Sequence, residues 1–257
     1  MSKPSLIGVI HIPALPGSHE YGGDMNAILQ TVAQEAQIFA SAKVDAIILE
    51  NMHDRPYLNG AVGPETTAAM TAVAVEARRY FAGLCGIQIL AGANKEALAV
   101  ALAANLDFIR AEGFVFAHVA DEGLIEAQAG ALLRYRRNIG AEHVQIWTDI
   151  KKKHSAHAIT ADVSLAETAK AAEFFCADAL IVTGSSTGQA TSPSDLKAVK
   201  NASSLPVYIG SGITIENVAD YSSADGFIVG SSIKTDGHWA SPLDEQKVRA
   251  LKLKMEN

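Results

Sequence analysis

Short apolar runs alternate with amphipathic stretches along almost the whole chain. The runs, such as DAIILEN at 45–51, have the length and composition of strands buried on both faces. Between them, apolar residues recur three or four positions apart, as at Ile28, Val32, Ala36 and Phe39, which is typical of a helix with one buried face. The pattern predicts strands at 6–12, 45–51, 86–92, 107–112, 143–150, 179–184, 207–209 and 227–229, and helices at 25–43, from 64, from 94, 122–138, 165–175, from 193, from 214 and at 244–255.

Several residues fit the starts of these helices. Pro64 suits a first helical position, with Glu65 either in the first turn or in contact with a lid. Asn94 and Thr214 are predicted N-caps.

Eight strand–helix units in a chain of 257 residues favour a closed parallel barrel. Parallel strands joined by helices occur in α/β folds, and eight such units are typical of a (β/α)8 TIM barrel. No GxGxxG motif follows the first strand, which argues against a Rossmann fold. Since no linker interrupts the pattern, we expect one domain spanning 1–257.

Composition and charge narrow the class of protein. Apolar residues make up 49%, charged residues 19%, and the net charge is −7, which excludes a largely disordered chain and argues against nucleic-acid binding. No apolar run approaches the ~20 residues of a membrane span. Cys85 and Cys176 are predicted to be buried free thiols in a reducing compartment. We therefore expect a soluble intracellular protein, cytoplasmic or, if a presequence is removed, in the mitochondrial matrix.

Two glycine- and serine-rich turns follow the last two predicted strands. They read Gly210-Ser211-Gly212 and Gly230-Ser231-Ser232. Glycine lets a backbone approach a ligand closely, and the loops after the last two strands of many TIM barrels hold a phosphate. The turns are therefore a candidate phosphate site, which Gly184 and Ser185 extend. Such turns also occur as simple strand exits.

Polar side chains are predicted to point into the barrel near its carboxyl-terminal end. Strand alternation places Asp149 and Lys151 on the inner face of one strand, Glu112 on the next, and Glu50 and His11 on two others. An unpaired charge inside a barrel is costly, and barrel enzymes keep their catalytic groups at this end. These five residues are the candidate catalytic set.

Each candidate also has a purely structural interpretation. Arg110 fits an ion pair with Glu50 or Asp149. His11 fits a loop histidine whose hydrogen-bonding groups are satisfied, and Lys151 fits a solvated charge. Gln88, Gln145 and Trp147 fit the barrel core better than the chemistry. His154 and His157 have a spacing that suits a metal, yet no third ligand is close in sequence. The sequence requires no cofactor and leaves a divalent metal open.

Several long motifs resemble the BtpA family. They are IGVIHIPALPGS, VGPETTAAMTAVA, DEGLIEAQAGALLRYRR, DIKKKHS, ALIVTGSSTG and IGSGITIENV, and the resemblance runs from about residue 6 to 256. It implies a barrel of the ribulose-phosphate-binding class. The family takes its name from a cyanobacterial factor needed for photosystem I stability, and it includes bacterial sugar-operon proteins described as nucleosidases. GANKEALAVA and AEGFVFAHVADEG are most similar to an uncharacterised animal branch, so a photosynthetic role does not carry over.

Two functions remain open. One is an enzyme on a phosphorylated sugar or nucleoside-type substrate, with a nucleosidase, isomerase or lyase reaction. In it Asp149 and Glu112 share acid–base work, Glu50 and His11 orient the substrate, and Lys151 stabilises an oxyanion. The other is a non-catalytic assembly or stability factor, for which we expect a large exposed apolar patch and a barrel mouth plugged by side chains. A homo-oligomer is compatible with either.

Overall fold

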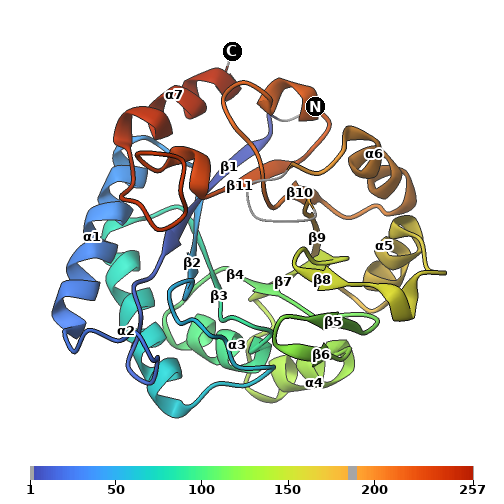
Figure 1. The fold of residues 1–257 in the computed structure, drawn as a ribbon, viewed down its shortest axis with the longest axis horizontal. Helices are drawn as coiled ribbons and strands as arrows, with labels where there is room; N and C mark the ends of the chain where they lie inside the picture. Colours follow the sequence, from blue (N-terminus) through green and yellow to red (C-terminus); the bar gives the residue numbers. More distant parts are fainter. Residues whose placement is uncertain (1–2, 185–189, 257) are drawn as a thin grey trace.

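Eight parallel strands form a closed barrel with helices around it (Figure 1). The computed structural model describes residues 3–184 and 190–256. In barrel order from β1, the neighbours are β11, β10, β9, β7, β4, β3 and β2, and β2 closes on β1. This confirms the predicted (β/α)8 fold. The strands are β1 (Ser5–His11), β2 (Ala46–Glu50), β3 (Leu84–Gln88), β4 (Phe108–Ala111), β7 (Gln145–Ile150), β9 (Ala179–Val182), β10 (Val207–Ile209) and β11 (Gly226–Val229).

The outer layer consists of α-helices that pack their apolar stripes against the barrel. In α1, for example, Ile28, Val32, Ala36 and Phe39 are buried, as their spacing predicts. The α-helices are α1 (Met25–Ser41), α2 (Pro64–Tyr80), α3 (Asn94–Ala103), α4 (Ala129–Asn138), α5 (Leu165–Phe174), α6 (Pro193–Ala202) and α7 (Glu245–Glu256), and the 3-10 helices are η1 (Ala158–Thr160), η2 (Val218–Tyr221) and η3 (Ser231–Ile233).

Three stacked aromatic rings fill the barrel interior below the candidate site. Trp147 lies between Phe108 and Tyr208, with ring centroids 3.8 Å and 4.3 Å away. Gly86 makes room for the stack, since a Cβ there would lie 2.2 Å from the Phe108 ring. Trp147 therefore belongs to the core.

The segment predicted as a helix from 122 to 138 differs from the expectation. Only Ala129–Asn138 is helical, and the residues before it form two short strands, β5 (His118–Ala120) and β6 (Gly123–Ile125). Gly123, with a φ of +110°, opens the turn that lets them pair. With β8 (Ser155–Ala156) they form a separate antiparallel sheet.

Three smaller predictions were wrong. Ala93, not Asn94, is the N-cap of α3, because the Asn94 side chain bonds to the backbone of Glu112. Thr214 precedes a turn and the 3-10 helix η2 rather than an α-helix. Cys85 is buried, but Cys176 is exposed, since it lies just beyond the end of α5 at a φ of +64°.

No helix within residues 3–184 and 190–256 has both the length and the apolarity that a bilayer crossing requires.

Candidate functional site

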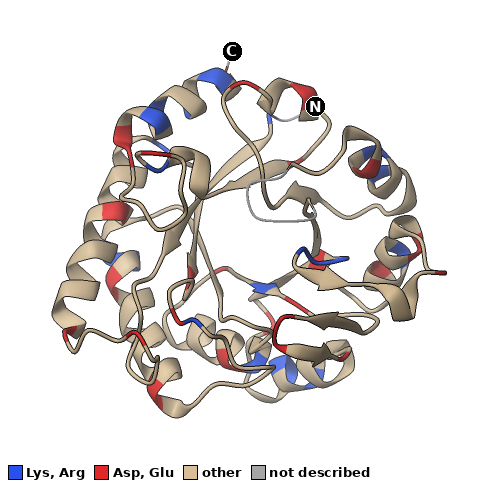
Figure 2. Ribbon diagram, viewed as in Figure 1, with Lys and Arg blue, Asp and Glu red and all other residues tan. Residues whose placement is uncertain are grey.

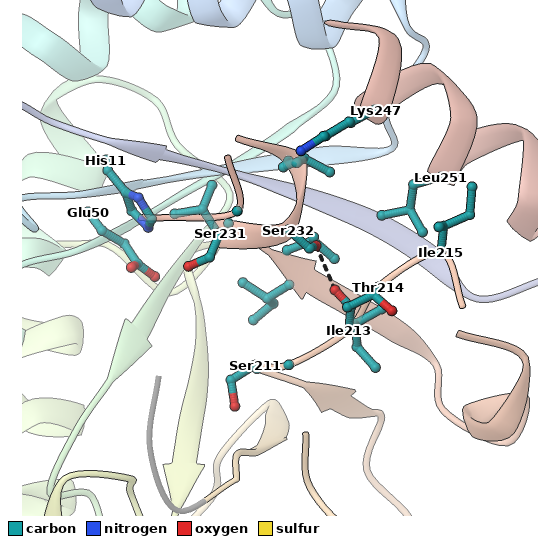
Figure 3. A pocket seen from close by; sticks show the side chains of 18 of the residues that line it. His11, Glu50, Ser211, Ile213, Thr214, Ile215, Ser231, Ser232, Lys247 and Leu251 are labelled. Atoms are coloured by element: carbon teal, nitrogen blue, oxygen red, sulfur yellow. Dashed lines mark hydrogen bonds between the residues drawn. The ribbon is translucent and has the colours of Figure 1, made fainter. Parts of the chain in front are cut away.

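A cavity of about 560 Å³ opens at the carboxyl-terminal end of the barrel strands. Figure 3 shows His11, Glu50 and Ser231 at one end, and Ile215, Lys247 and Leu251 at the other. The first end is polar and lies over the barrel centre, and the second reaches α7. The pocket therefore joins the barrel interior to the two glycine-rich turns.

Both turns line this cavity. Gly210, Ser211 and Gly212 contribute from the end of β10, and Gly230, Ser231 and Ser232 from the end of β11. The Ser232 hydroxyl donates a hydrogen bond of 2.6 Å to the Ile213 carbonyl and so ties the turns together (Figure 3).

Two of the turn glycines make room for charged or polar neighbours. A Cβ on Gly210 would lie 3.2 Å from Nη2 of Arg110, and one on Gly230 would lie 3.0 Å from Nε2 of His11. A third, Gly212, has a φ of +73°, which disfavours other residues. Among the described residues, the backbone N–H groups of Gly212 and Ser231 donate to no protein acceptor, so they are free to meet a ligand.

Of the other two predicted phosphate residues, the structure describes Gly184, which does not line the cavity. Gly184 donates its backbone N–H to the Ser211 hydroxyl at 3.1 Å, so it supports the first turn from behind. Ser185 lies outside the described residues.

Arg110 holds two of the predicted catalytic carboxylates. Its Nε and Nη2 bind the two oxygens of Asp149, each at 2.8 Å, and its Nη1 binds Glu50 at 3.1 Å. All three side chains are buried. Burial alone would lower the pKa of Arg110, but Asp149 and Glu50 raise it, so the guanidinium stays charged. The predicted ion pair therefore forms with both partners, and Asp149 is occupied by it.

Glu112 lies inside the barrel but does not line the cavity. It accepts a hydrogen bond from Gln88 at 2.9 Å, and the Lys152 ammonium lies 3.0 Å from its other oxygen. Burial raises the pKa of Glu112, and Lys152 partly offsets this. The bonds from Asn94 to its backbone fix its position. This environment favours a positioning role for Glu112 over direct contact with a ligand.

His11 presents a hydrogen-bond acceptor to the cavity. Its Nδ1 lies 2.8 Å from the Trp239 carbonyl; a carbonyl only accepts, so Nδ1 carries the hydrogen and Nε2 keeps its lone pair. Burial lowers the pKa of His11 to about 3. The ring is therefore neutral at physiological pH.

The lysine run after β7 does not follow the predicted strand parity. Lys151, with a φ of +49°, ends the strand, and its ammonium binds the Thr160 carbonyl at 3.3 Å. It does not line the cavity, whereas Lys153 does. The left-handed residue turns the chain, so the third lysine of the run takes the place that alternation assigned to the first.

A family model for the BtpA family matches residues 2–257. The chain belongs to the BtpA family. A Caenorhabditis elegans protein named as uncharacterised and mitochondrial is 50% identical over 252 residues, covering 96% of this chain and 91% of its own. The photosystem I biogenesis protein BtpA of Synechocystis is 35% identical over 247 residues, covering 95% and 85%.

Solved structures share the fold of this BtpA-family chain at low identity. An orotidine 5'-monophosphate decarboxylase from Methanocaldococcus jannaschii, complexed with the inhibitor BMP, has a TM-score of 0.62 at 16% identity, with full coverage of both chains. KGPDC from Streptococcus mutans has a TM-score of 0.61 at 13% identity, covering 99% of this chain and 98% of its own. These similarities support the predicted TIM-barrel fold.

His118 in β5 and His157 just after β8 lie at the small sheet, whereas His11 lines the cavity. His157 packs against His118 with ring centroids 5.4 Å apart and contacts the Lys152 carbonyl at 3.0 Å. Within the described residues no group of three or more His, Cys, Asp or Glu side chains could hold a metal ion.

Glu65 lies in the first turn of α2, as one of its two interpretations predicts.

Sequence reasoning missed one residue that lines the cavity, Lys153, and two that lie next to it in the fold, Trp239 and Lys234. Lys153 belongs to a visible basic run, but only the turn at Lys151 brings it into the cavity. Trp239 and Lys234 come from the long connection after β11, which carries no periodicity. They contact His11 and Glu35 from 199 or more residues away in sequence, so no local signal could have found them.

Proposed function

We propose that this protein is an enzyme acting on a phosphorylated sugar or nucleoside-type small molecule. The turns 210–212 and 230–232 hold its phosphate through backbone N–H groups and serine hydroxyls. The rest of the substrate lies over the barrel centre, within reach of Glu50, His11 and Lys153. The observation that carries this proposal is a single cavity lined by both turns and by these three side chains.

The roles of the predicted catalytic residues change with this geometry. Glu50 keeps one side open to the cavity, and we assign acid–base work to it. Asp149 and Glu112 hold Arg110 and Lys152 in place and act as positioning residues. His11 orients a substrate hydroxyl through Nε2. The stabilisation of developing negative charge moves from Lys151 to Lys153.

Two further observations support an enzyme over a scaffold. Structural neighbours such as orotidine 5'-monophosphate decarboxylase and N-(5'-phosphoribosyl)anthranilate isomerase are named after phosphorylated substrates. A scaffold barrel is expected to have a plugged mouth, whereas this barrel holds a cavity of about 560 Å³. The Synechocystis relative's name supports the assembly factor, and nothing in the cavity favours it. A mitochondrial location fits the name of the C. elegans relative.

A negative charge introduced at position 231 tests the phosphate site. Ser231→Asp places a carboxylate on the wall where the phosphate is proposed to lie, and Ser231→Asn adds nearly the same volume without charge. Repulsion between two close charges is worth several kcal/mol at the surface of a protein, so we expect ribose 5-phosphate to bind at least about tenfold more weakly to the Asp variant. Isothermal titration calorimetry measures the affinities.

The comparison between the two variants decides the result. Ser231→Asn is expected to bind within about threefold of the parent, which corresponds to less than 1 kcal/mol. Equal affinity of the parent and Ser231→Asp would show that the phosphate binds elsewhere, and the proposed site would then be wrong.

A further inference from the structure

Lys153 has an unusual setting among the lysines near the barrel mouth. Lys152 pairs with Glu112 at 3.0 Å, and Lys234 pairs with Glu35 at 2.8 Å. Within residues 3–184 and 190–256, no carboxylate lies within 4.0 Å of the Lys153 ammonium. The side chain nevertheless lines the cavity, beside Arg110. Lys153 is therefore a cavity residue whose amine none of the described carboxylates holds in an ion pair.

The surroundings of Lys153 favour the neutral amine. Burial is the main cause that lowers its pKa, and the charge of Arg110 lowers it further, against smaller opposite effects of Glu50, Asp149 and Glu112. Arg110 is locked by its own carboxylates, so its charge cannot move away. A neutral amine is a nucleophile, and a lysine desolvated next to another cation is a known way to obtain one.

We propose that Lys153 forms an imine with the carbonyl group of a phosphorylated aldehyde or ketone sugar. This inference rests on the proposed function, because the turns 210–212 and 230–232 would hold the phosphate of the same molecule. It narrows the substrate class to phosphosugars that can present a free carbonyl. It also gives the protein a covalent step.

The step balances with groups that line the cavity. The Lys153 ammonium gives one proton to Glu50, and its nitrogen lone pair attacks the carbonyl carbon. The carbonyl oxygen takes up a second proton from the same nitrogen, which gives a neutral carbinolamine. The C–O bond then breaks as the Glu50 proton returns, and one water leaves. In sum, an ammonium and a carbonyl give a protonated imine and water, with no oxidant or reductant.

The other two lysines of the run do not fit this role. The ammonium of Lys151 binds the Thr160 carbonyl outside the cavity. Lys152 is held by Glu112 and lies 3.8 Å from Glu122, and these carboxylates raise its pKa although burial opposes them. A protonated amine has no lone pair to attack with. The inference therefore names one residue of three consecutive lysines.

Pyridoxal 5'-phosphate is a suitable probe because it carries an aldehyde and a phosphate. The protein is incubated with it at low stoichiometry and near-neutral pH, reduced with sodium borohydride, and mapped by peptide mass spectrometry. We expect Lys153 to be labelled about tenfold or more faster than exposed lysines, because its lowered pKa leaves more neutral amine and the bound phosphate holds the aldehyde close to it. Inorganic phosphate is expected to slow this labelling.

Two variants and one analogue complete the experiment. Lys153→Arg keeps a long basic side chain but lacks a primary amine, so it should lose the label, while inorganic phosphate should still bind to the turns 210–212 and 230–232. Lys170→Arg, at an exposed position on α5, should leave the label on Lys153. Pyridoxal, which lacks the phosphate, should label Lys153 more slowly than pyridoxal 5'-phosphate.

The outcomes separate this inference from the proposed function. Labelling of Lys151, Lys152 or surface lysines in preference to Lys153 would overturn the imine, even if ribose 5-phosphate binds as proposed. Equal labelling of Lys153 by pyridoxal and pyridoxal 5'-phosphate, without protection by phosphate, would show that Lys153 is the nucleophile. It would also show that the phosphate group does not contribute to binding beside Lys153.

Discussion

Arg110→Met is expected to lower the free energy of unfolding by about 3–5 kcal/mol, because it leaves buried charge without a partner. Arg110 neutralises both Asp149 and Glu50 through three hydrogen bonds of 2.8–3.1 Å. Methionine keeps much of the volume of the side chain but cannot donate any of these bonds. Urea denaturation followed by circular dichroism at neutral pH measures the loss.

Two controls identify the origin of this effect. Arg137→Met removes an exposed arginine that pairs with Glu142, and surface ion pairs contribute at most about 1 kcal/mol. Adding Asp149→Asn to Arg110→Met removes one of the orphaned charges and should recover part of the stability. If Arg110→Met costs no more than Arg137→Met, the buried network does not hold the barrel mouth together.

Lys234→Met is expected to have a similarly large effect in a different part of the fold. Lys234 is 2% exposed and binds Glu35, itself buried in α1, at 2.8 Å. Breaking a buried ion pair from one side costs about 3–5 kcal/mol. The pair joins the connection after β11 to α1, and the same connection supplies the Trp239 carbonyl to His11.

The pH dependence of the Lys234→Met variant gives a second, independent signature. Burial raises the pKa of Glu35, while Lys234 lowers it, so loss of the lysine raises this pKa further. A carboxyl whose pKa is higher in the folded protein stabilises it at acid pH, and this contribution is lost as the pH rises through the folded pKa. The stability deficit should therefore be smallest at acid pH and grow as the pH rises through the raised pKa of Glu35.

A second substitution at Glu35 provides the control for this prediction. Glu35→Gln in the Lys234→Met background removes the charge and should remove the pH dependence of the deficit. A surface substitution, Lys197→Met at an exposed position of α6, should change stability by less than about 0.5 kcal/mol. A deficit in Lys234→Met that does not depend on pH would show that Glu35 is not the group left unpaired.

The barrel and most of its inward-facing groups could be predicted because they depend on local alternation. Strand parity places His11, Glu50, Arg110 and Asp149 inside, and the pairing of His11 with Glu50 across β1 and β2 puts them at one level. The glycines of the two turns were also visible, since Gly210 and Gly230 lie one residue beyond buried strands. The structure brings all of these groups except Asp149 to one cavity, and Asp149 binds Arg110 instead.

The remaining features depend on backbone turns and distant contacts that local patterns do not encode. A left-handed residue at Lys151 breaks the alternation, so parity assigned the wrong lysine to the cavity. Whether an inward carboxylate is free or occupied depends on its neighbours across the barrel. Arg110 fills the space beside Asp149, whereas Glu112 is taken by Gln88 and Lys152. Figure 2 shows charged residues of both signs on the outer helices. The number of charged residues in the sequence therefore does not by itself identify the few that face the barrel interior.

The central claim is that the turns after β10 and β11 bind the phosphate of a small substrate, and amide chemical shifts test it most directly. A titration of 15N-labelled protein with ribose 5-phosphate should move the Gly212 and Ser231 amide signals most, in a saturable way, because their N–H groups would donate to the phosphate. Saturable shifts centred on other loops, with these two amides unchanged, would contradict the account.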